Sequence, residues 1–308
     1  MCHNDGRMEQ NMKRQNNMIW ILYIFLFCVP LFLVLSIYIS RTNTDSHDWS
    51  TETEKVDDSL KNRMQELACC PTTFYDSCEP TIIEKAYNEA RLRGEKEGFF
   101  PVLLTLEENI EISLLDQLGI EFGKKEVDLE KIKVRRKELM QTTENGKDWL
   151  DLQLRILQKD FEAESPCFYE EEVLGEYVAN GIGNTSFNGI LNDETGRTLP
   201  LLLAEVPVRQ PWQLLAWFPF GGWNACPEAE HLVSVAKHWY EGYGAVPAVI
   251  SEGVVEFTVP QPVSEEESLA LAKEHYAFCT DIVDQNVGTI NALADVLRKS
   301  TVWFFWWD

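Results

Sequence analysis

Three segments decide the fold of this chain: PWQLLAWFPFGGWNACP (residues 211–227), AFCTDIVDQNVGTI (277–290) and TVWFFWWD (301–308). Seven of the ten tryptophans lie between residues 211 and 308. They are Trp212, Trp217, Trp223, Trp239, Trp303, Trp306 and Trp307. Tryptophan is the largest apolar side chain, and its N–H usually needs a partner when it is buried. Such a cluster predicts either a large, specific core or a stacking surface.

The composition limits the classes of protein to which the chain could belong. With 308 residues, of which 45% are apolar, it has room for one membrane or targeting element and one or two domains with a real core. The net charge is −23, and residues 199–308 carry five Lys and Arg against fourteen Asp and Glu. Phosphate backbones and anionic lipid headgroups repel such a surface, so we expect no nucleic-acid binding. The charge suits a basic partner or a divalent cation, or it serves solubility alone.

Residues 18–40 (MIWILYIFLFCVPLFLVLSIYIS) form an uncharged apolar run after a polar N-terminal tail, residues 1–17. A helix of about 20 apolar residues crosses a bilayer, and a proline such as Pro30 is tolerated there. A cleaved signal peptide is the alternative interpretation. It is disfavoured because the run is longer than an ordinary signal core and no small-x-small cleavage site follows it. We therefore expect an uncleaved, single-pass transmembrane helix.

The charges that flank this run predict its orientation in the cell membrane. Arg7, Lys13 and Arg14 precede the run, whereas Arg41 and Lys55 are the basic residues in the fifteen positions after it. Cytoplasmic flanks of membrane helices carry an excess of Lys and Arg. The N-terminus is therefore expected inside the cell, and the C-terminal domain is expected to be extracytoplasmic.

Residues 41–78 are polar and indicate a stalk that ends in a cysteine-bearing loop. The sequence CCPTTFYDSC brings Cys69, Cys70 and Cys78 together. These cysteines could bind a metal, but the C-x-x-C spacing that is usual in such sites is absent. Disulfides that clip the loop to an exported domain are the preferred interpretation.

The rest of the chain predicts a helix-rich part, residues 79–198, followed by an α+β domain, residues 199–308. Periodicity and capping signals predict helices over 80–94 or 80–98, 107–118, 129–140, 149–161, 226–243, 264–278 and 289–298. Apolar or alternating runs predict strands over 99–106, 199–208, 214–220, 246–250, 254–259 and 302–307. Because helices and strands are interleaved irregularly and a hairpin is included, we expect an α+β fold with a mixed β-sheet and helices packed on it.

Several of these segments resemble a known family. PWQLLAWFPFGGWNACP, HWYEGYGAVPAVI, HYAFCTDIVDQNVGTI and VWFFWWD occur in the order found in a bacterial family catalogued as domain-of-unknown-function family 4253. The resemblance covers residues 199–308, and more loosely 80–198. It implies cysteine at the positions of Cys226 and Cys279, and it implies no activity, substrate or cofactor. Members of that family look cytosolic, so the apolar run at 18–40 departs from the family pattern.

Cys226 is a candidate nucleophile. It precedes Pro227 at the expected start of a helix, where the helix dipole favours a thiolate, and a histidine such as His238 could activate it. Two alternatives stay open: a buried, inert thiol, and a disulfide with Cys279.

A metal site is a second possibility. His231, His238 and Glu241 share one helix face, and His275 and Cys279 share another, so the two sets could meet if the helices pack together. Such spacings arise often by coincidence. We therefore expect no metal, and no cofactor either, since the loop NGIGNTSFNG (180–189) lacks the third glycine of a dinucleotide motif.

The polar residues after Cys279 are the preferred candidates for a functional site. Asp281, Asp284 and Gln285 lie in a loop held by an aromatic core, where functional residues often lie, and Asp308 could join them. A carboxylate pair could perform acid–base chemistry; alternatively, these residues cap turns. Two residues of the tryptophan-rich segment complete this set of candidates, Trp223 and Asn224.

Two functions from different classes fit these features. The first is a membrane-anchored, non-catalytic module that binds a basic protein partner, for example as a protector against a basic toxin. The second is a hydrolase or thiol enzyme that uses Cys226, His238, Asp281 or Asp284. We prefer the binding module, because the sequence contains no strong catalytic signature.

Overall fold

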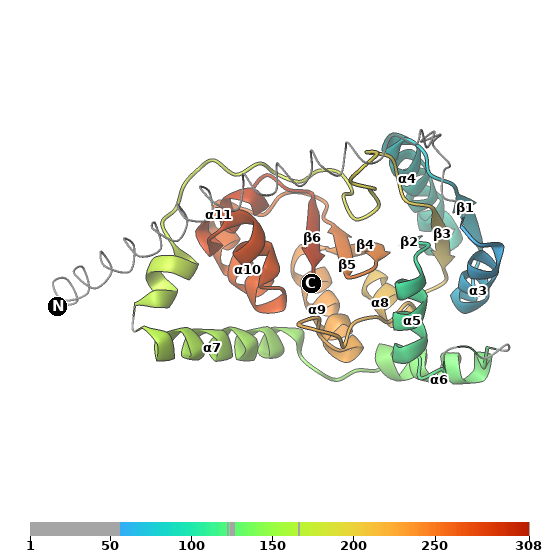
Figure 1. Ribbon diagram of the computed structural model, residues 1–308, viewed down its shortest axis with the longest axis horizontal. Coiled ribbons are helices and arrows are strands. Elements are labelled where there is room, and N and C mark those ends of the chain that lie inside the picture. The colour runs from blue at the N-terminus through green and yellow to red at the C-terminus, as the bar shows by residue number, and fades with distance from the viewer. Residues whose placement is uncertain (1–55, 122, 124–126, 166, 308) are drawn as a thin grey trace, which may run out of the picture. The chain divides into compact units, whose positions relative to one another are not determined.

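The computed structural model describes residues 56–121, 123, 127–165 and 167–307, and within them six strands form one mixed sheet (Figure 1). The strands are β1 (Thr72–Tyr75), β2 (Phe100–Thr105), β3 (Leu201–Val206), β4 (Val246–Ser251), β5 (Val254–Thr258) and β6 (Val302–Trp306). Their order across the sheet is β1-β3-β2-β4-β5-β6. Strands β2 and β4 are parallel, and every other neighbouring pair is antiparallel. The expected α+β fold with a mixed sheet is confirmed.

The helices of the described residues vary from short to long. They are α3 (Asp58–Ala68), α4 (Pro80–Glu97), α5 (Glu108–Gln117), α6 (Leu129–Met140), α7 (Gly146–Glu164), α8 (Leu214–Trp217), α9 (Ala229–Tyr243), α10 (Glu265–Phe278) and α11 (Ile290–Leu297). Short π-helical turns lie at Tyr169–Leu174 and Val283–Val287. None of the helices in the described part of the chain is long and apolar enough to cross a membrane. The predicted span at 18–40 lies outside the described residues.

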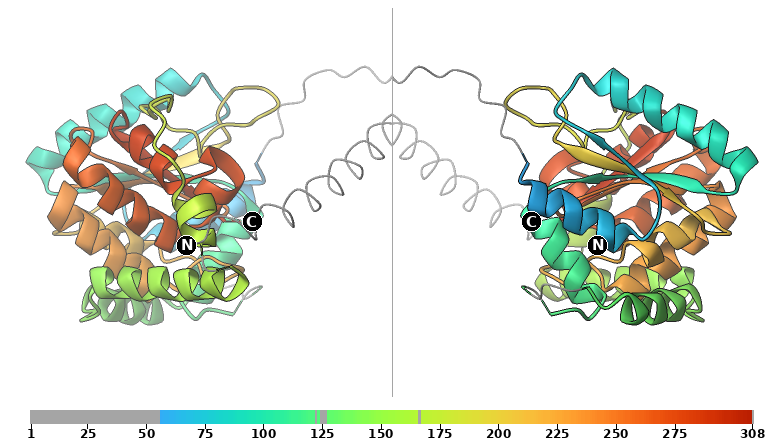
Figure 2. Two further views of the ribbon diagram at one scale, coloured as in Figure 1. Left: turned by 90° about the vertical axis from the view of Figure 1, so that its left-hand side faces the viewer. Right: turned by 90° about the vertical axis from the view of Figure 1, so that its right-hand side faces the viewer.

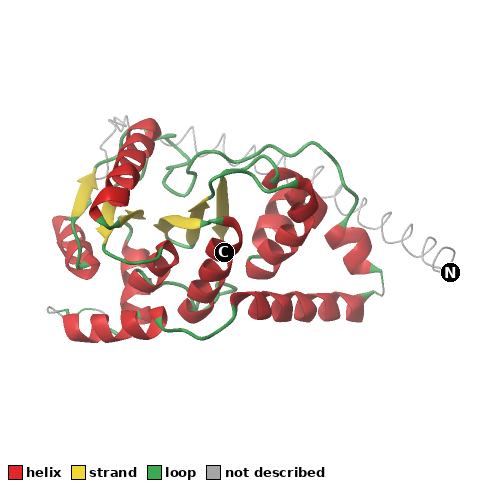
Figure 3. Ribbon diagram, turned by 180° about the vertical axis from the view of Figure 1, so that it is seen from behind, coloured by secondary structure: helices red, strands yellow, loops and turns green. Residues whose placement is uncertain are grey.

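The two faces of the sheet are covered differently (Figure 2). One face is covered by α4 and by the loop that enters β3, which runs along the same side of the molecule (Figure 3). There Tyr87 of α4 packs edge-on against Phe187 of the loop, with ring centroids 5.2 Å apart. The other face carries the larger core, to which helices α5 to α11 all contribute. Successive strand residues point to opposite faces, so each strand supplies both cores.

The tryptophans form a core rather than a stacking surface. Trp239 is fully buried at its centre, and its indole N–H donates to the Glu274 carboxylate at 2.9 Å. Its ring lies 5.0 Å from that of Phe278, 5.7 Å from that of Trp303 and 5.3 Å from that of Phe305. Helices α9 and α10 are therefore joined to β6 through aromatic contacts.

Several predicted boundaries hold. Ser264 and Thr289 are N-caps, of α10 and α11, and Thr289 accepts from the Ala292 N–H at 3.1 Å. Gly244 ends α9 in the left-handed conformation, and the predicted hairpin joins β4 to β5.

Other predictions of local structure are wrong. Residues 214–220 do not form a strand: a 3-10 turn at Pro211–Gln213 leads into α8, because the Gln210 and Gln213 side chains form a capping box. Residues 72–75 belong to the sheet as β1 rather than to a loop. Helix α9 starts at Ala229 with Glu228 as N-cap, so Cys226 lies before the cap position.

The predicted disulfides are also absent. The cysteines for which disulfides were considered, Cys69, Cys70, Cys78, Cys226 and Cys279, are free thiols. Cys69 instead ends α3 in the left-handed conformation, with φ 53°.

Candidate functional site

A cavity of about 460 Å³ lies at the end of the sheet where the parallel strands β2 and β4 terminate. We call it the sheet-end pocket. Its lining residues come from α5 (Asn109, Ile110, Ile112, Ser113 and Asp116), from the loop before α9 (Phe220–Asn224) and from the β4–β5 turn (Glu252 and Gly253). Ligands of α/β proteins commonly bind beyond the carboxyl ends of parallel strands, because the chain leaves the sheet there in diverging directions.

The loop that forms one wall has an unusual backbone. Gly221, Gly222 and Asn224 have φ of 100°, 77° and 47°, which are left-handed values that favour glycine and tolerate asparagine. A Cβ atom at Gly221 would lie 2.1 Å from the Pro227 carbonyl oxygen, so only glycine fits. The Gly221 carbonyl accepts from the Gln117 side chain of α5 at 3.0 Å, which fixes the loop against the opposite wall.

The Trp223 ring packs on the β4–β5 turn. Gly253 has φ 67° in this turn, and a Cβ atom there would lie 2.8 Å from Cη2 of Trp223. The Trp223 ring can pack against this turn because residue 253 has no side chain.

We expect Gly253→Ala to destabilise the protein more than Gly196→Ala does. Both glycines have nearly the same φ, 67° and 65°, so both variants pay about 1 kcal/mol for a left-handed alanine. Nothing lies within 4 Å of a Cβ atom at Gly196, whereas the one at Gly253 strikes Trp223, which should cost roughly 1–3 kcal/mol more. Urea unfolding of both variants measures the difference, and equal losses would contradict the seating of Trp223.

A small polar network connects the elements that line the pocket. Thr105 and Ser251, at the ends of β2 and β4, both donate to the Glu107 carboxylate, at 2.7 and 2.9 Å. Asn109 of α5 donates to Glu252 of the hairpin turn. These bonds join the start of α5 to the hairpin and so hold two walls of the pocket in register.

The chemistry of the lining is acidic and partly apolar. Asp116 and Glu252 supply carboxylates, and none of the described residues that line the pocket is Lys or Arg. Ile112 is 39% exposed, which is high for an apolar side chain, and it adds apolar surface to that of Trp223. The buried Ser113 hydroxyl has no hydrogen-bond partner among the described residues. The pocket is suited to a group that combines positive charge with an apolar portion.

The two candidate cysteines, Cys226 and Cys279, lie close to residues of this pocket without lining it. Burial raises the pKa of the Cys226 thiol above its ordinary value, and it raises the pKa of the Cys279 thiol to about 12. The Cys279 thiol donates to the Trp306 carbonyl at 2.9 Å, and the next residue, Trp307, donates its N–H to the Gly253 carbonyl at 3.0 Å. Both thiols are protonated at neutral pH, and a protonated thiol is a poor nucleophile.

His238 is not placed to activate Cys226. It lies nine residues into α9 from Ala229, which is about 13 Å along the helix axis, and Cys226 precedes that helix. The His238 ring instead pairs with Glu274 of α10, with Nε2 and Oε2 3.0 Å apart.

The other histidines are dispersed as well. His231 pairs with Glu144 at 2.8 Å. His275 follows Glu274 on α10, so its side chain projects about 100° away around the helix axis, and its ring packs against Trp303 in the aromatic core. Among the described residues, no cluster of three or more His, Cys, Asp and Glu side chains is arranged to hold a metal ion. Glu274 itself is not among the predicted residues, because its role depends on the packing of α10 against α9.

The acidic candidates form a separate group. Asp281 and Gln285 bond to each other, with the Gln285 amide donating at 3.0 Å, and the Tyr276 hydroxyl donates to Asp284 at 3.3 Å. Burial raises the pKa of Asp284. These residues follow α10 and do not line the sheet-end pocket, whereas Trp223 and Asn224 do. Asp308 lies outside the described residues.

The fold and pocket define an α+β domain with a ligand-sized acidic site at one end of a mixed sheet. Residues 202–308 match a protein family described as "Domain of unknown function (DUF4253)". The matched region supplies the Phe220–Asn224 loop and the hairpin turn, whereas α5 lies before it. No curated protein and no solved structure matches the chain.

Proposed function

We propose that this chain is a membrane-anchored, non-catalytic binding module that recognises a basic segment of a protein partner through the sheet-end pocket. The observation that carries the proposal is the lining of this pocket, which combines the carboxylates of Asp116 and Glu252 with apolar surface from Trp223 and Ile112. A lysine or arginine side chain has the same division, since a charged head follows an apolar stem.

Two further properties support this function. The net charge of −23 attracts basic partners and raises the rate at which they meet the protein. The candidate nucleophile Cys226 and the second candidate cysteine, Cys279, are both buried and protonated, which supports binding rather than thiol catalysis.

Titration with short peptides tests the proposal. We expect the full-length chain in detergent micelles to bind acetyl-Leu-Arg-Leu-amide more tightly than acetyl-Leu-Glu-Leu-amide, as measured by calorimetry. Asp116→Asn and Glu252→Gln should each weaken binding of the basic peptide roughly tenfold. Each removes one charge whose attraction to the arginine contributes about 1.4 kcal/mol to the binding free energy. Glu89→Gln is the matched control, since Glu89 is an exposed carboxylate on α4. Equal binding of both peptides, or equal effects of all three substitutions, would refute the proposed function.

The location of the module is a second part of the proposal. It is supported by the uncharged run at 18–40 and by the basic residues that precede it. Protease added to intact cells should digest the domain at residues 56–308 without lysis. Protection until the cells are lysed would contradict the proposed orientation.

A further inference from the structure

A second cavity, of about 560 Å³, lies at the open end of the β4–β5 hairpin. Val246 and Thr258, which pair at that end, line this cavity, whereas the hairpin turn lines the sheet-end pocket. Other lining residues come from α4, from residues 185–187 of the loop that enters β3, and from the start of β6. We call this cavity the α4 pocket. Its size is within the range of about 300–1,000 Å³ that is usual for small-molecule sites.

Helix α4 lines this pocket with residues of one helix face. They are Glu84, Tyr87, Asn88 and Arg91, and residues three, four and seven positions apart lie on the same side of a helix. Tyr87 is buried and packs on Phe187 of the loop. Glu84 is half-buried, and Asn88 and Arg91 are exposed. Three polar side chains of α4 are therefore accessible to a ligand.

The pocket carries two opposite charges at a fixed spacing. Glu84 and Arg91 are the charged residues among the described residues that line it. They are seven positions apart, which corresponds to about 10.5 Å along the helix axis. Glu84 forms no ion pair with another described residue. Arg91 pairs with Glu95 at 3.0 Å, but the two side chains are 48% and 61% exposed. Such a surface pair contributes little stability, so the carboxylate of a ligand can compete for the guanidinium.

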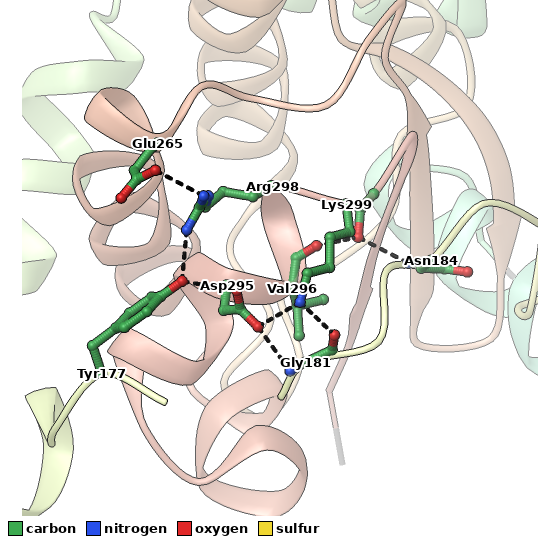
Figure 4. A network of polar contacts seen from close by, with 9 residues as sticks. Tyr177, Gly181, Asn184, Glu265, Asp295, Val296, Arg298 and Lys299 are labelled. Atoms are coloured by element: carbon green, nitrogen blue, oxygen red, sulfur yellow. Dashed lines mark hydrogen bonds and ion pairs between the residues drawn. The ribbon is translucent and has the colours of Figure 1, made fainter. Parts of the chain in front are cut away.

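Residues 185–187 are held in place from both sides. Before them, the Gly181 N–H donates at 2.8 Å to Asp295 of α11, which is 1% exposed (Figure 4). After them, the Asn188 N–H donates at 2.8 Å to Glu256 of β5, which is fully buried. Because both acceptors are buried, the segment between them is fixed before any ligand binds. Such preorganisation lowers the entropic cost of binding.

The remaining lining suits the main chain of a peptide. Thr185 and Ser186 are exposed, and their hydroxyls can donate to a carbonyl or accept from an N–H. The Asn88 amide on α4 can do the same. Val246 and Pro260 add apolar surface for small side chains. Polar groups of both kinds thus accompany the two charges.

We propose that the α4 pocket binds a short, extended peptide whose two termini are free. The peptide amine pairs with the Glu84 carboxylate, and the peptide carboxylate accepts from the Arg91 guanidinium, whose fork of N–H groups matches a carboxylate. Three extended residues span about 10 Å, which matches the axial distance between the two side chains. The peptide groups between the termini bond to Asn88, Thr185 and Ser186.

Calorimetric titration of the full-length chain in detergent micelles tests the proposal with four probes. They are trialanine with free termini, its N-acetyl form, its C-terminal amide and free alanine. We expect trialanine to bind with a saturable heat. Each blocked form should bind roughly tenfold more weakly or worse, because one charge-assisted contact is lost. Free alanine should also bind at least roughly tenfold more weakly, because its two charges are too close together to reach both side chains.

Two substitutions identify the side chain that binds each terminus. Glu84→Gln should weaken binding of trialanine roughly tenfold, and acetylation of the peptide should then cause no further loss. Arg91→Gln should have the same effect on affinity, and in this variant amidation of the peptide should cause no further loss. Circular dichroism would verify that both variants are folded.

The controls lie on the same helix. Glu89→Gln removes an exposed carboxylate that does not line the pocket, and it should leave trialanine binding unchanged. Glu95→Gln removes the ion pair of Arg91 but keeps its guanidinium, so binding should be at least as tight as in the wild type. Absence of a saturable heat, equal binding of trialanine and its blocked forms, or equal effects of Glu84→Gln and Glu89→Gln would overturn the proposal. Asp116→Asn should leave trialanine binding intact, which separates this test from that of the sheet-end pocket.

Discussion

Trp239→Ala is expected to lower the free energy of unfolding by about 3–5 kcal/mol, as other removals of large buried aromatic side chains do. Trp239 is a fully buried residue of α9. Its ring contacts aromatic rings of β5, α10 and β6. The smaller side chain leaves a cavity that this rigid aromatic cluster cannot fill. The Glu274 carboxylate, 9% exposed, also loses the indole N–H as a donor.

Urea unfolding followed by circular dichroism measures this loss. Trp306→Ala is the control, because Trp306 is a half-buried tryptophan of the edge strand β6. Its removal should cost about 1–2 kcal/mol, in line with the smaller apolar area that it buries. Equal losses for the two variants would show that Trp239 is not the centre of the core.

Glu256→Gln is expected to remove a decline in stability that the wild-type protein shows as pH rises from about 4.5 to about 8. Glu256 is fully buried on β5, on the face covered by α4, and one of its oxygens accepts from the Asn188 N–H at 2.8 Å. Burial raises the pKa of this carboxyl to about 8 from an ordinary value of 4.5. The group is therefore protonated in the folded protein at pH 7, whereas in the unfolded chain it is ionised.

The sign of the effect follows from proton binding. Between pH 4.5 and 8 the folded state holds a proton that the unfolded state has released, so raising the pH favours unfolding. The stability that protonated Glu256 permits is fully present below pH 4.5 and is lost as pH rises to about 8. The full loss is roughly 3–5 kcal/mol, since each pKa unit corresponds to about 1.4 kcal/mol.

Glutamine has the shape of the protonated acid and does not titrate. The difference in unfolding free energy between Glu256→Gln and wild type should therefore grow in favour of the variant over this pH range. Other titrating groups contribute equally to the pH dependence of both proteins, so their contributions cancel in the difference between the two unfolding free energies. The exposed Glu89→Gln should give a difference that stays flat with pH. A flat difference for Glu256→Gln would show that Glu256 is ionised in the folded protein.

Local signals predicted much of the fold. Thr289 and Gly244 mark helix ends because capping and left-handed termination depend on a few neighbouring residues. The prediction of a strand at 214–220 is wrong because a short apolar run is compatible with either a strand or a buried helix. The predicted strand at 302–307 is present as β6 over Val302–Trp306, but β6 is an edge strand, which apolar residues alone do not reveal.

The candidate site was predicted only in part, because it depends on contacts distant in sequence. Trp223 and Asn224 were singled out from the tryptophan-rich segment, and both line the sheet-end pocket. Asp116 and Ser113 were missed, since they reach the pocket only through the parallel pairing of β2 with β4. The glycine pair before Trp223 was a signal of close backbone approach that could have indicated this loop.

The central claim is that the sheet-end pocket selects its partner by charge, and charge reversal tests it most directly. The double variant Asp116→Lys with Glu252→Lys should bind acetyl-Leu-Glu-Leu-amide more tightly than acetyl-Leu-Arg-Leu-amide, the opposite of the wild-type preference. Circular dichroism would verify that the variant is folded. A folded double variant that still prefers the basic peptide would contradict the account, because the carboxylates of the pocket would then play no part in recognition.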